Sequence, residues 1–89
     1  MSLQTQDNSK PHRGGNIERE GMVVTMRPMS ILFFDDYGQK EIFVPISQVK
    51  DWWFTTTGSK DGLGIEDLEP DDEVTLIIPR WLAVKERLV

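Results

Sequence analysis

The chain has 89 residues, a formal net charge of -5 and no cysteine. Its length fits one small domain, and its acidity argues against a generic duplex-DNA binder, which takes its affinity from Lys and Arg. No apolar run approaches the ~18 residues that span a bilayer, so no membrane partner is expected. Because a secreted domain this small usually needs disulfides, and no signal peptide is recognisable, the sequence predicts a cytoplasmic protein.

The start of the chain carries little that could be buried. Apart from Met1 and Leu3 its residues are polar, small or charged, so we expect a disordered tail over residues 1–16. A short basic cluster in this tail, Lys10, His12 and Arg13, is typical of a solvated segment. One folded domain is therefore expected over residues 17–89.

The hydrophobic pattern predicts five strands and one helix. β-Branched and aromatic residues indicate strands over residues 17–27, 30–35, 40–44, 50–57 and 73–78. A 3₁₀-like turn is expected at 45–49 and a loop at 58–72, and Pro79 begins a C-terminal helix of about nine residues. The sequence thus predicts a mainly β fold, a small five-stranded SH3-like or OB-like barrel with one short C-terminal helix.

The second and third strands are predicted to form a hairpin with a definite register. If Tyr37 and Gly38 form a two-residue loop, with Gly38 supplying a positive φ, Asp35 faces Lys40. One face of the hairpin then carries Ile31, Phe33, Ile42 and Val44, and the other carries Leu32, Phe34 and Phe43. Because both faces are apolar, the second must be covered by the C-terminal helix or by a partner. Alternatively, the helix packs against an open end of the barrel. Trp81 is expected to anchor that helix in the core.

Catalysis finds little support in the sequence, and we expect a protein that is not an enzyme. The single histidine, His12, lies in the predicted tail, and the chain has no cysteine, so no nucleophile–base pair is available in the folded region. Carboxylates are plentiful, but their spacing does not select a catalytic pair. No cofactor and no metal site are predicted.

An acidic segment follows the glycine-rich loop. Its six acids are Glu66, Asp67, Glu69, Asp71, Asp72 and Glu73. They could bind Ca²⁺ or Mg²⁺, although the loop lacks the ligand spacing of an EF-hand, or they could meet a basic protein as an acidic interface. We favour a third interpretation, a solvated loop whose charges keep the protein in solution.

The aromatic residues supply the candidate binding site. Its predicted members are Leu32, Phe34, Phe43 and Trp53, with Lys40 and Lys50 close by. Barrels of the OB type stack single-stranded bases on such side chains, whereas the simpler interpretation is that the rings form the core and the seat of the helix. We favour the simpler one, because the net charge disfavours nucleic acid.

Two punctuated segments resemble a known group of proteins. Residues Glu41 to Val49 (EIFVPISQV) and Ile78 to Lys85 (IPRWLAVK) are similar to segments of short, uncharacterised bacterial and phage proteins. In those proteins Trp is frequent where this chain has Phe43, and glycine where it has Arg87. The resemblance implies a compact β-barrel, often encoded in phages or mobile elements, without an established activity or catalytic residue.

The expected function is that of a non-catalytic binding module. It would contact protein, including a second copy of itself, through an apolar-aromatic face with acidic surroundings. The alternative is an accessory protein that binds single-stranded nucleic acid through Phe34, Phe43 and Trp53.

Overall fold

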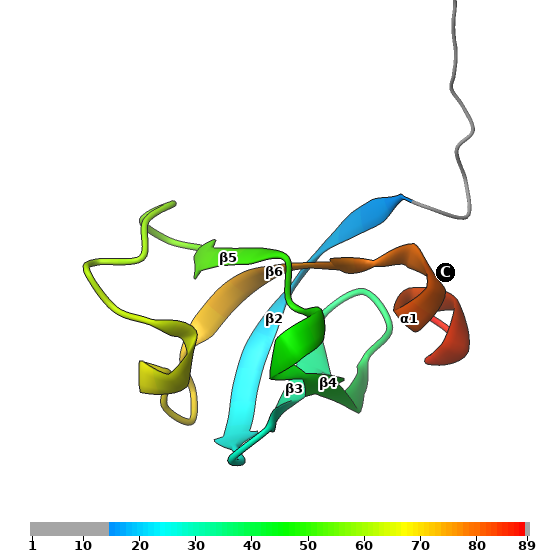
Figure 1. Cartoon of the computed structure of the whole chain (residues 1–89), viewed down its shortest axis with the longest axis horizontal. Helices are drawn as coiled ribbons and strands as arrows, with labels where there is room; N and C mark the ends of the chain where they lie inside the picture. Colours follow the sequence, from blue (N-terminus) through cyan, green and yellow to red (C-terminus); the bar gives the residue numbers. More distant parts are fainter. Residues whose placement is uncertain (1–14, 89) are drawn as a thin grey trace, which may run out of the picture.

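The computed structural model describes residues 15–88, which form one antiparallel sheet and one helix. The strands are β2 (Asn16–Met26), β3 (Ser30–Asp35), β4 (Lys40–Pro45), β5 (Asp51–Phe54) and β6 (Glu73–Pro79). Two 3₁₀ turns, η2 (Ile46–Gln48) and η3 (Ile65–Asp67), precede β5 and β6, and helix α1 (Arg80–Lys85) follows β6. The predicted mainly β fold with a short C-terminal helix is confirmed (Figure 1).

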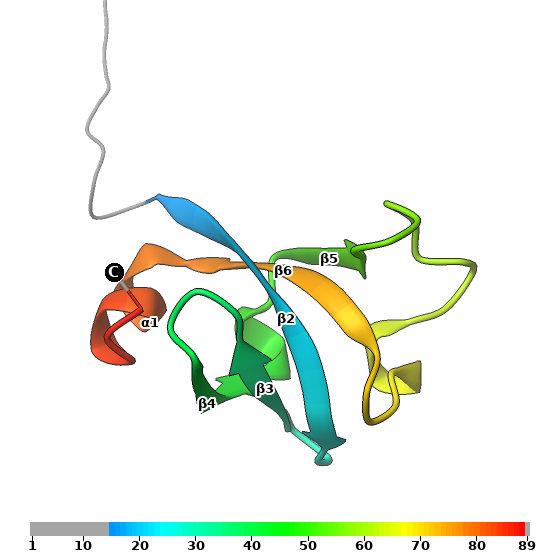
Figure 2. The ribbon, with the colours of Figure 1, turned by 180° about the vertical axis from the view of Figure 1, so that it is seen from behind.

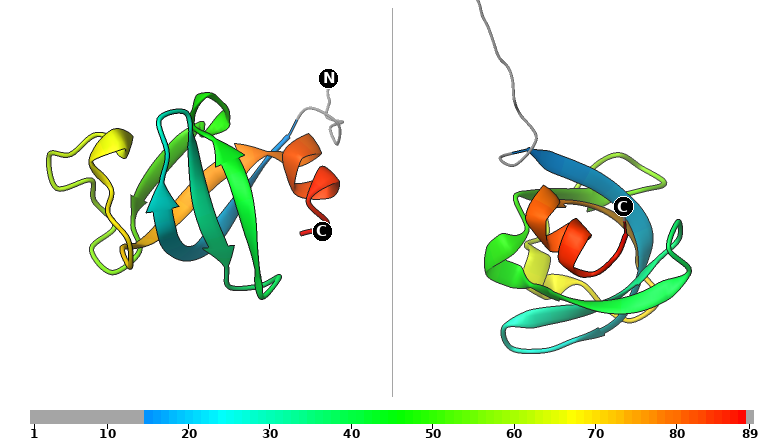
Figure 3. Two further views of the ribbon diagram at one scale, coloured as in Figure 1. Left: turned by 90° about the horizontal axis from the view of Figure 1, so that it is seen from below. Right: turned by 90° about the vertical axis from the view of Figure 1, so that its right-hand side faces the viewer.

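The strand order is β4-β3-β2-β6-β5, so β2 is the centre of the sheet. β2 pairs with β3 along one edge and with β6 along the other (Figure 2). Figure 3 shows the sheet curving around its inner face with α1 across one end. The sheet is barrel-like but does not close, since β4 and β5 remain its two edges. The choice between an SH3-like and an OB-like barrel stays a prediction.

The core fills the concave face of this curved sheet. Its buried apolar residues are Val23, Ile31, Phe33, Ile42, Val44, Trp52, Leu68, Val74, Leu76, Ile78, Leu82, Ala83 and Leu88. Strand alternation explains the set, because successive side chains point to opposite faces of a sheet. Trp52 is buried and its neighbour Trp53 is partly exposed, as adjacent residues of one strand must be.

The predicted register of the β3–β4 hairpin is confirmed from Asp35 opposite Lys40 to Ile31 opposite Val44. The turn itself differs from the prediction. It spans residues 36–39, and the positive φ belongs to Gln39 rather than Gly38. Gly38 serves a steric purpose, because a Cβ there would lie 2.9 Å from Asp35 Oδ2 and 3.1 Å from Leu88 Cδ2.

A β-bulge in β2 changes which of its side chains face the core. The pairing with β3 shifts between Val23 and Thr25. Strand alternation alone predicts that Met22, Val24 and Met26 share one face. Instead Met22 pairs with outward-facing Phe34, whereas Met26 pairs with buried Ile31 and packs against the core.

The C-terminal helix differs most from expectation. It has six residues rather than about nine, and Pro79 is its N-cap and the last residue of β6. Trp81 was predicted as a core anchor, but it is 50% exposed; Leu82 and Ala83 take the buried positions. α1 contacts β6 and β2 at the end of the barrel, so the second face of the hairpin is not its seat.

Two segment boundaries also differ from the predictions. The fourth strand is Asp51–Phe54, shorter than residues 50–57, because the chain turns at 55–58 after Phe54. The predicted tail overlaps the structure at Asn16, which already belongs to β2, whereas residues 1–14, with Lys10, His12 and Arg13, lie outside the described residues.

Candidate functional site

The convex face of the sheet carries an apolar surface that no element of the described chain covers. Cross-strand pairing aligns Met22 with Phe34, and Leu32 with Phe43, on the outer face of β2, β3 and β4. Phe43 is 50% exposed, and the other three are partly buried. These four residues, Met22, Leu32, Phe34 and Phe43, are called the outer patch below.

The local sequence explains why the outer patch exists. In β3 every outward position between Ser30 and Asp35 is apolar, so Leu32 and Phe34 face out while Ile31 and Phe33 face in. A half-exposed strand normally alternates apolar with polar residues. The expectation that both faces of this hairpin would be covered is therefore not met within the described chain.

Charged side chains border the outer patch on several sides. The guanidinium of Arg27 lies 5.4 Å from the centre of the Phe43 ring, a cation–π contact. Glu41 is the cross-strand partner of Phe34, and Glu73 is that of Met22. An apolar centre with a polar rim is the usual composition of a protein–protein interface.

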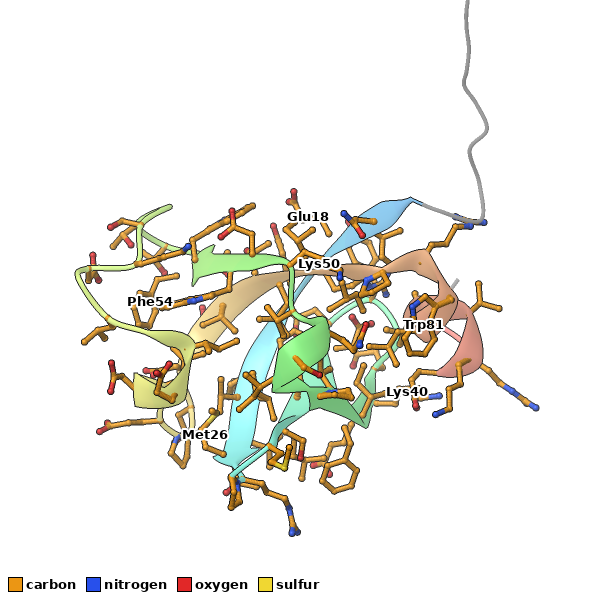
Figure 4. All side chains as sticks on the ribbon, viewed as in Figure 1. Glu18, Met26, Lys40, Lys50, Phe54 and Trp81 are labelled. Atoms are coloured by element: carbon orange, nitrogen blue, oxygen red, sulfur yellow. The ribbon has the colours of Figure 1, made fainter. Side chains whose placement is uncertain are left out.

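Three predicted members of the site do not join this surface. Trp53 faces outward on β5, but β2 and β6 separate it from the β3–β4 hairpin. Lys40 belongs to the opposite face of its strand, and its Nζ donates a hydrogen bond of 2.6 Å to the carbonyl oxygen of Glu86. Lys50 precedes β5 and donates its backbone N–H to the carbonyl of Ile77 in β6, so it lies beside β6 and apart from Lys40 (Figure 4). Leu32, Phe34 and Phe43 are the predicted residues that the fold brings together.

The six predicted acids form no compact cation site. Two of them order the loop: Asp67 Oδ2 accepts the Gly64 N–H at 2.9 Å, and Asp72 Oδ2 accepts the Glu69 N–H at 2.8 Å. Asp71 has a φ of 75°, and its N–H bonds to the carbonyl of Val23. Glu66, Glu69 and Glu73 are exposed. Within residues 15–88 no three His, Cys, Asp or Glu side chains are grouped so that they could hold a metal ion.

A buried ion pair near the α1 end was not anticipated from the sequence. Arg19 donates from Nε to Asp35 Oδ1 at 2.8 Å and from Nη2 to Asp35 Oδ2 at 2.6 Å. Asp35 is fully buried and also accepts the N–H of Gly38, while the Tyr37 ring lies 5.1 Å from the guanidinium. The hydrogen bonds that Arg19 donates to Asp35 raise the pKa of Arg19 above its ordinary value.

This pair has a structural role, because each charge is fully occupied by the other. It joins β2 to the β3–β4 turn, against which Leu88 packs after α1. The hairpin register could have predicted this pair. Asp35 lies on the same face of β3 as Ile31 and Phe33, and an acid on a buried face needs a cationic partner.

A second exposed group, on α1, was also missed. Trp81 and Val84 are 50% and 51% exposed and lie three residues apart on one side of the helix. Figure 4 shows Trp81 at the α1 end of the molecule. The sequence predicted Trp81 as a core anchor, but so short a helix buries only its Leu82–Ala83 side.

Comparisons with protein-family models, with curated proteins and with solved structures find no match. The helix that the structure describes is too short to cross a membrane. The geometry of the chain is therefore the basis for a functional proposal.

Proposed function

We propose that this chain is a non-catalytic binding module that contacts protein through the outer patch, and that this patch also mediates self-association. The observation that carries the proposal is the continuity of Met22, Leu32, Phe34 and Phe43 across three strands without a covering element. A small domain that exposes a contiguous apolar surface gains free energy by covering it. The cytoplasmic setting and the link to phages or mobile elements belong to this proposal on the sequence alone.

The non-catalytic part of the proposal is supported by how the titratable groups are used. The buried charges Arg19 and Asp35 neutralise each other through two short hydrogen bonds. The acids of residues 66–73 are turned to solvent or hydrogen-bonded to loop amides. None of these groups is an unpartnered buried acid or base, which is the usual signature of a catalytic centre.

The energetic contribution of the outer patch can be estimated at Phe43. Burying the exposed half of its side chain removes roughly 100 Å² from water, worth about 2.5 kcal/mol per copy. Truncation to Ser should therefore weaken a contact by about 70-fold for each Phe43 removed. The loss should be visible for any protein partner that seats on this ring, including a second copy.

The test is a concentration series of NMR spectra in about 500 mM NaCl, where charge contacts are screened. We expect the amide signals of β3 and β4 to shift with concentration while those of residues 58–72 stay constant. Phe43→Ser should remove the shifts, and Trp53→Ser, which deletes a partly exposed ring on β5 outside the outer patch, should leave them unchanged. Constant β3 and β4 signals up to the millimolar range would contradict self-association.

The nucleic-acid alternative enters the same experiment as a separate arm. A single-strand binder should take up a labelled oligonucleotide most strongly at low salt, because phosphate contacts dominate there. Because β2 and β6 separate Trp53 from Phe34 and Phe43, this arm concerns stacking on Phe34 and Phe43. Oligonucleotide binding that Phe43→Ser abolishes would replace the protein-binding proposal.

A further inference from the structure

We propose that α1 docks onto the acidic end of a second copy of this chain, in a head-to-tail contact distinct from the outer patch. The docking face on α1 consists of Arg80, Trp81, Val84 and Lys85. The acidic end, as defined here, consists of Leu63, Glu66, Asp67 and Glu69. Both sets are exposed or partly exposed in the single chain.

The docking face combines an aromatic anchor with cations. Trp81 and Val84 are adjacent on the helix surface, and Lys85 follows Trp81 by one turn. Leu82 and Ala83, on the other side, fix the helix to the core. Trp and Arg are the residues most enriched at the energetic centres of protein interfaces. The docking face therefore suits a partner that brings negative charge together with an apolar side chain.

The acidic end of the same chain has that composition. Leu63 is 42% exposed at the tip of the loop, and Glu66 and Asp67 follow it in η3. The side chains of Glu66 and Glu69 are exposed. An apolar anchor surrounded by carboxylates is the complement of a tryptophan surrounded by cations.

The charges of both surfaces are unpaired within the part of the chain that the structure describes. Residues 15–88 contain two ion pairs, Arg19–Asp35 and Lys60–Asp51, and neither uses a residue of the docking face or of the acidic end. Water solvates most exposed charges on a small protein, so an unpaired surface charge costs little folding free energy. What distinguishes the two surfaces is their composition: Arg80 and Lys85 flank the apolar residues of the docking face, and carboxylates flank Leu63 in the acidic end.

One copy cannot satisfy both surfaces by itself. Figure 1 shows α1 and the loop that carries the acidic end at opposite ends of the long axis, along which the principal extent is 46 Å. At about 8 Å, the Debye length at physiological salt is far shorter than this separation. A second molecule aligned along the same axis brings unlike poles together, so we commit to another copy of this chain as the occupant.

A head-to-tail contact has a signature that distinguishes it from association through the outer patch. Its two surfaces are different, so each added copy leaves both kinds of end free unless a ring closes. The average mass should therefore rise beyond two copies with concentration. The average mass should also decrease as the salt concentration rises. A contact between apolar outer patches would instead produce a dimer and no larger species, and it would persist at high salt.

The test is sedimentation equilibrium of the full chain over a concentration series in about 20 mM and about 500 mM NaCl, where the Debye length is about 20 Å and about 4 Å. We expect masses above two copies in low salt that decline in high salt. The double variant Arg80→Glu/Lys85→Glu and the double variant Glu66→Lys/Glu69→Lys should each weaken this assembly at least tenfold. Trp81→Ala should do the same, and Phe43→Ser, as the matched control, should not.

Mixing the two charge-reversed variants gives the most specific test, because it restores a pair of oppositely charged surfaces. A mixture of the two charge-reversed variants should associate in low salt, because one now has two acidic ends and the other two basic ends. All four positions are exposed and outside the core, so the variants should keep the fold, which circular dichroism checks. A monomeric wild type in low salt, or a mixture that fails to associate, would overturn the proposal. So would oligonucleotide binding to a monomer that Trp81→Ala abolishes.

Discussion

Breaking the buried Arg19–Asp35 pair should be the most costly single change outside the apolar core. Asp35 is fully buried and accepts from Arg19 at 2.8 and 2.6 Å, and Arg19 itself is only 8% exposed. Asp35→Asn keeps the volume and an acceptor for Gly38, but leaves the guanidinium buried without a counter-charge. Removing one partner of such a pair costs about 3–5 kcal/mol, against a total stability of about 5 kcal/mol for a small domain.

A double-mutant cycle measured by urea denaturation tests this expectation. Arg19→Met should lose about as much unfolding free energy as Asp35→Asn, because it strands the carboxylate instead. The double variant Arg19→Met/Asp35→Asn should be more stable than either single variant, since no charge remains buried. If either single variant lost less than about 1 kcal/mol of unfolding free energy, as solvent-exposed ion pairs do, the reasoning would be refuted.

The remaining predictions concern close packing, the helix and one surface carboxylate. Gly21→Ala should cost about 3 kcal/mol in chemical denaturation, because its Cβ would overlap the backbone of β3; an unchanged midpoint would show that the strands can separate there. Leu82→Ala should lower the unfolding free energy by about 2–5 kcal/mol and Trp81→Ala by much less, since only the first is buried; equal losses in thermal melts would contradict the helix orientation. The hydrogen bond from Lys60 lowers the pKa of Asp51, so Lys60→Ala should raise that pKa in an NMR titration; an unaltered titration would show that the pair does not form in solution. Because the folded pKa of Asp51 is the lower one, any stabilisation by this exposed pair is present at neutral pH and is lost as the pH falls through that pKa.

The β3–β4 hairpin could be predicted because its information is local. Two short apolar runs with a turn sequence between them predict a register that places Ile31, Phe33, Ile42 and Val44 on one face, and this is the face that is buried. The 3₁₀ turn after Pro45 and the outward direction of Phe43 follow from the same local pattern.

The predictions that the structure contradicts concern features set by contacts between residues far apart in the sequence. The bulge after Val23 cannot be read from the pattern, so the two ends of β2 were given one face. The positive φ was assigned to Gly38 by propensity, although Leu88, 50 residues further on in the sequence, packs against this glycine and Gln39 takes that conformation. Trp81 was placed in the core by hydrophobicity, but α1 turns Leu82 and Ala83 toward the core and leaves Trp81 50% exposed.

Two different surfaces thus follow from one small sheet. The outer patch results from apolar residues on the convex side of a sheet whose concave side is already full. The docking face on α1 results from a helix too short to bury more than one side. Because the first is apolar and the second charged, salt concentration separates their contributions in solution.

The most direct test of the central claim, that the outer patch is a contact surface, is the mass of the protein in about 500 mM NaCl, where charge contacts are screened. We predict a reversible dimer for the wild type and a monomer for Phe43→Ser at the same concentration. A wild type that remains monomeric at the highest attainable concentration, or a Phe43→Ser variant that dimerises as well as the wild type, would contradict the claim.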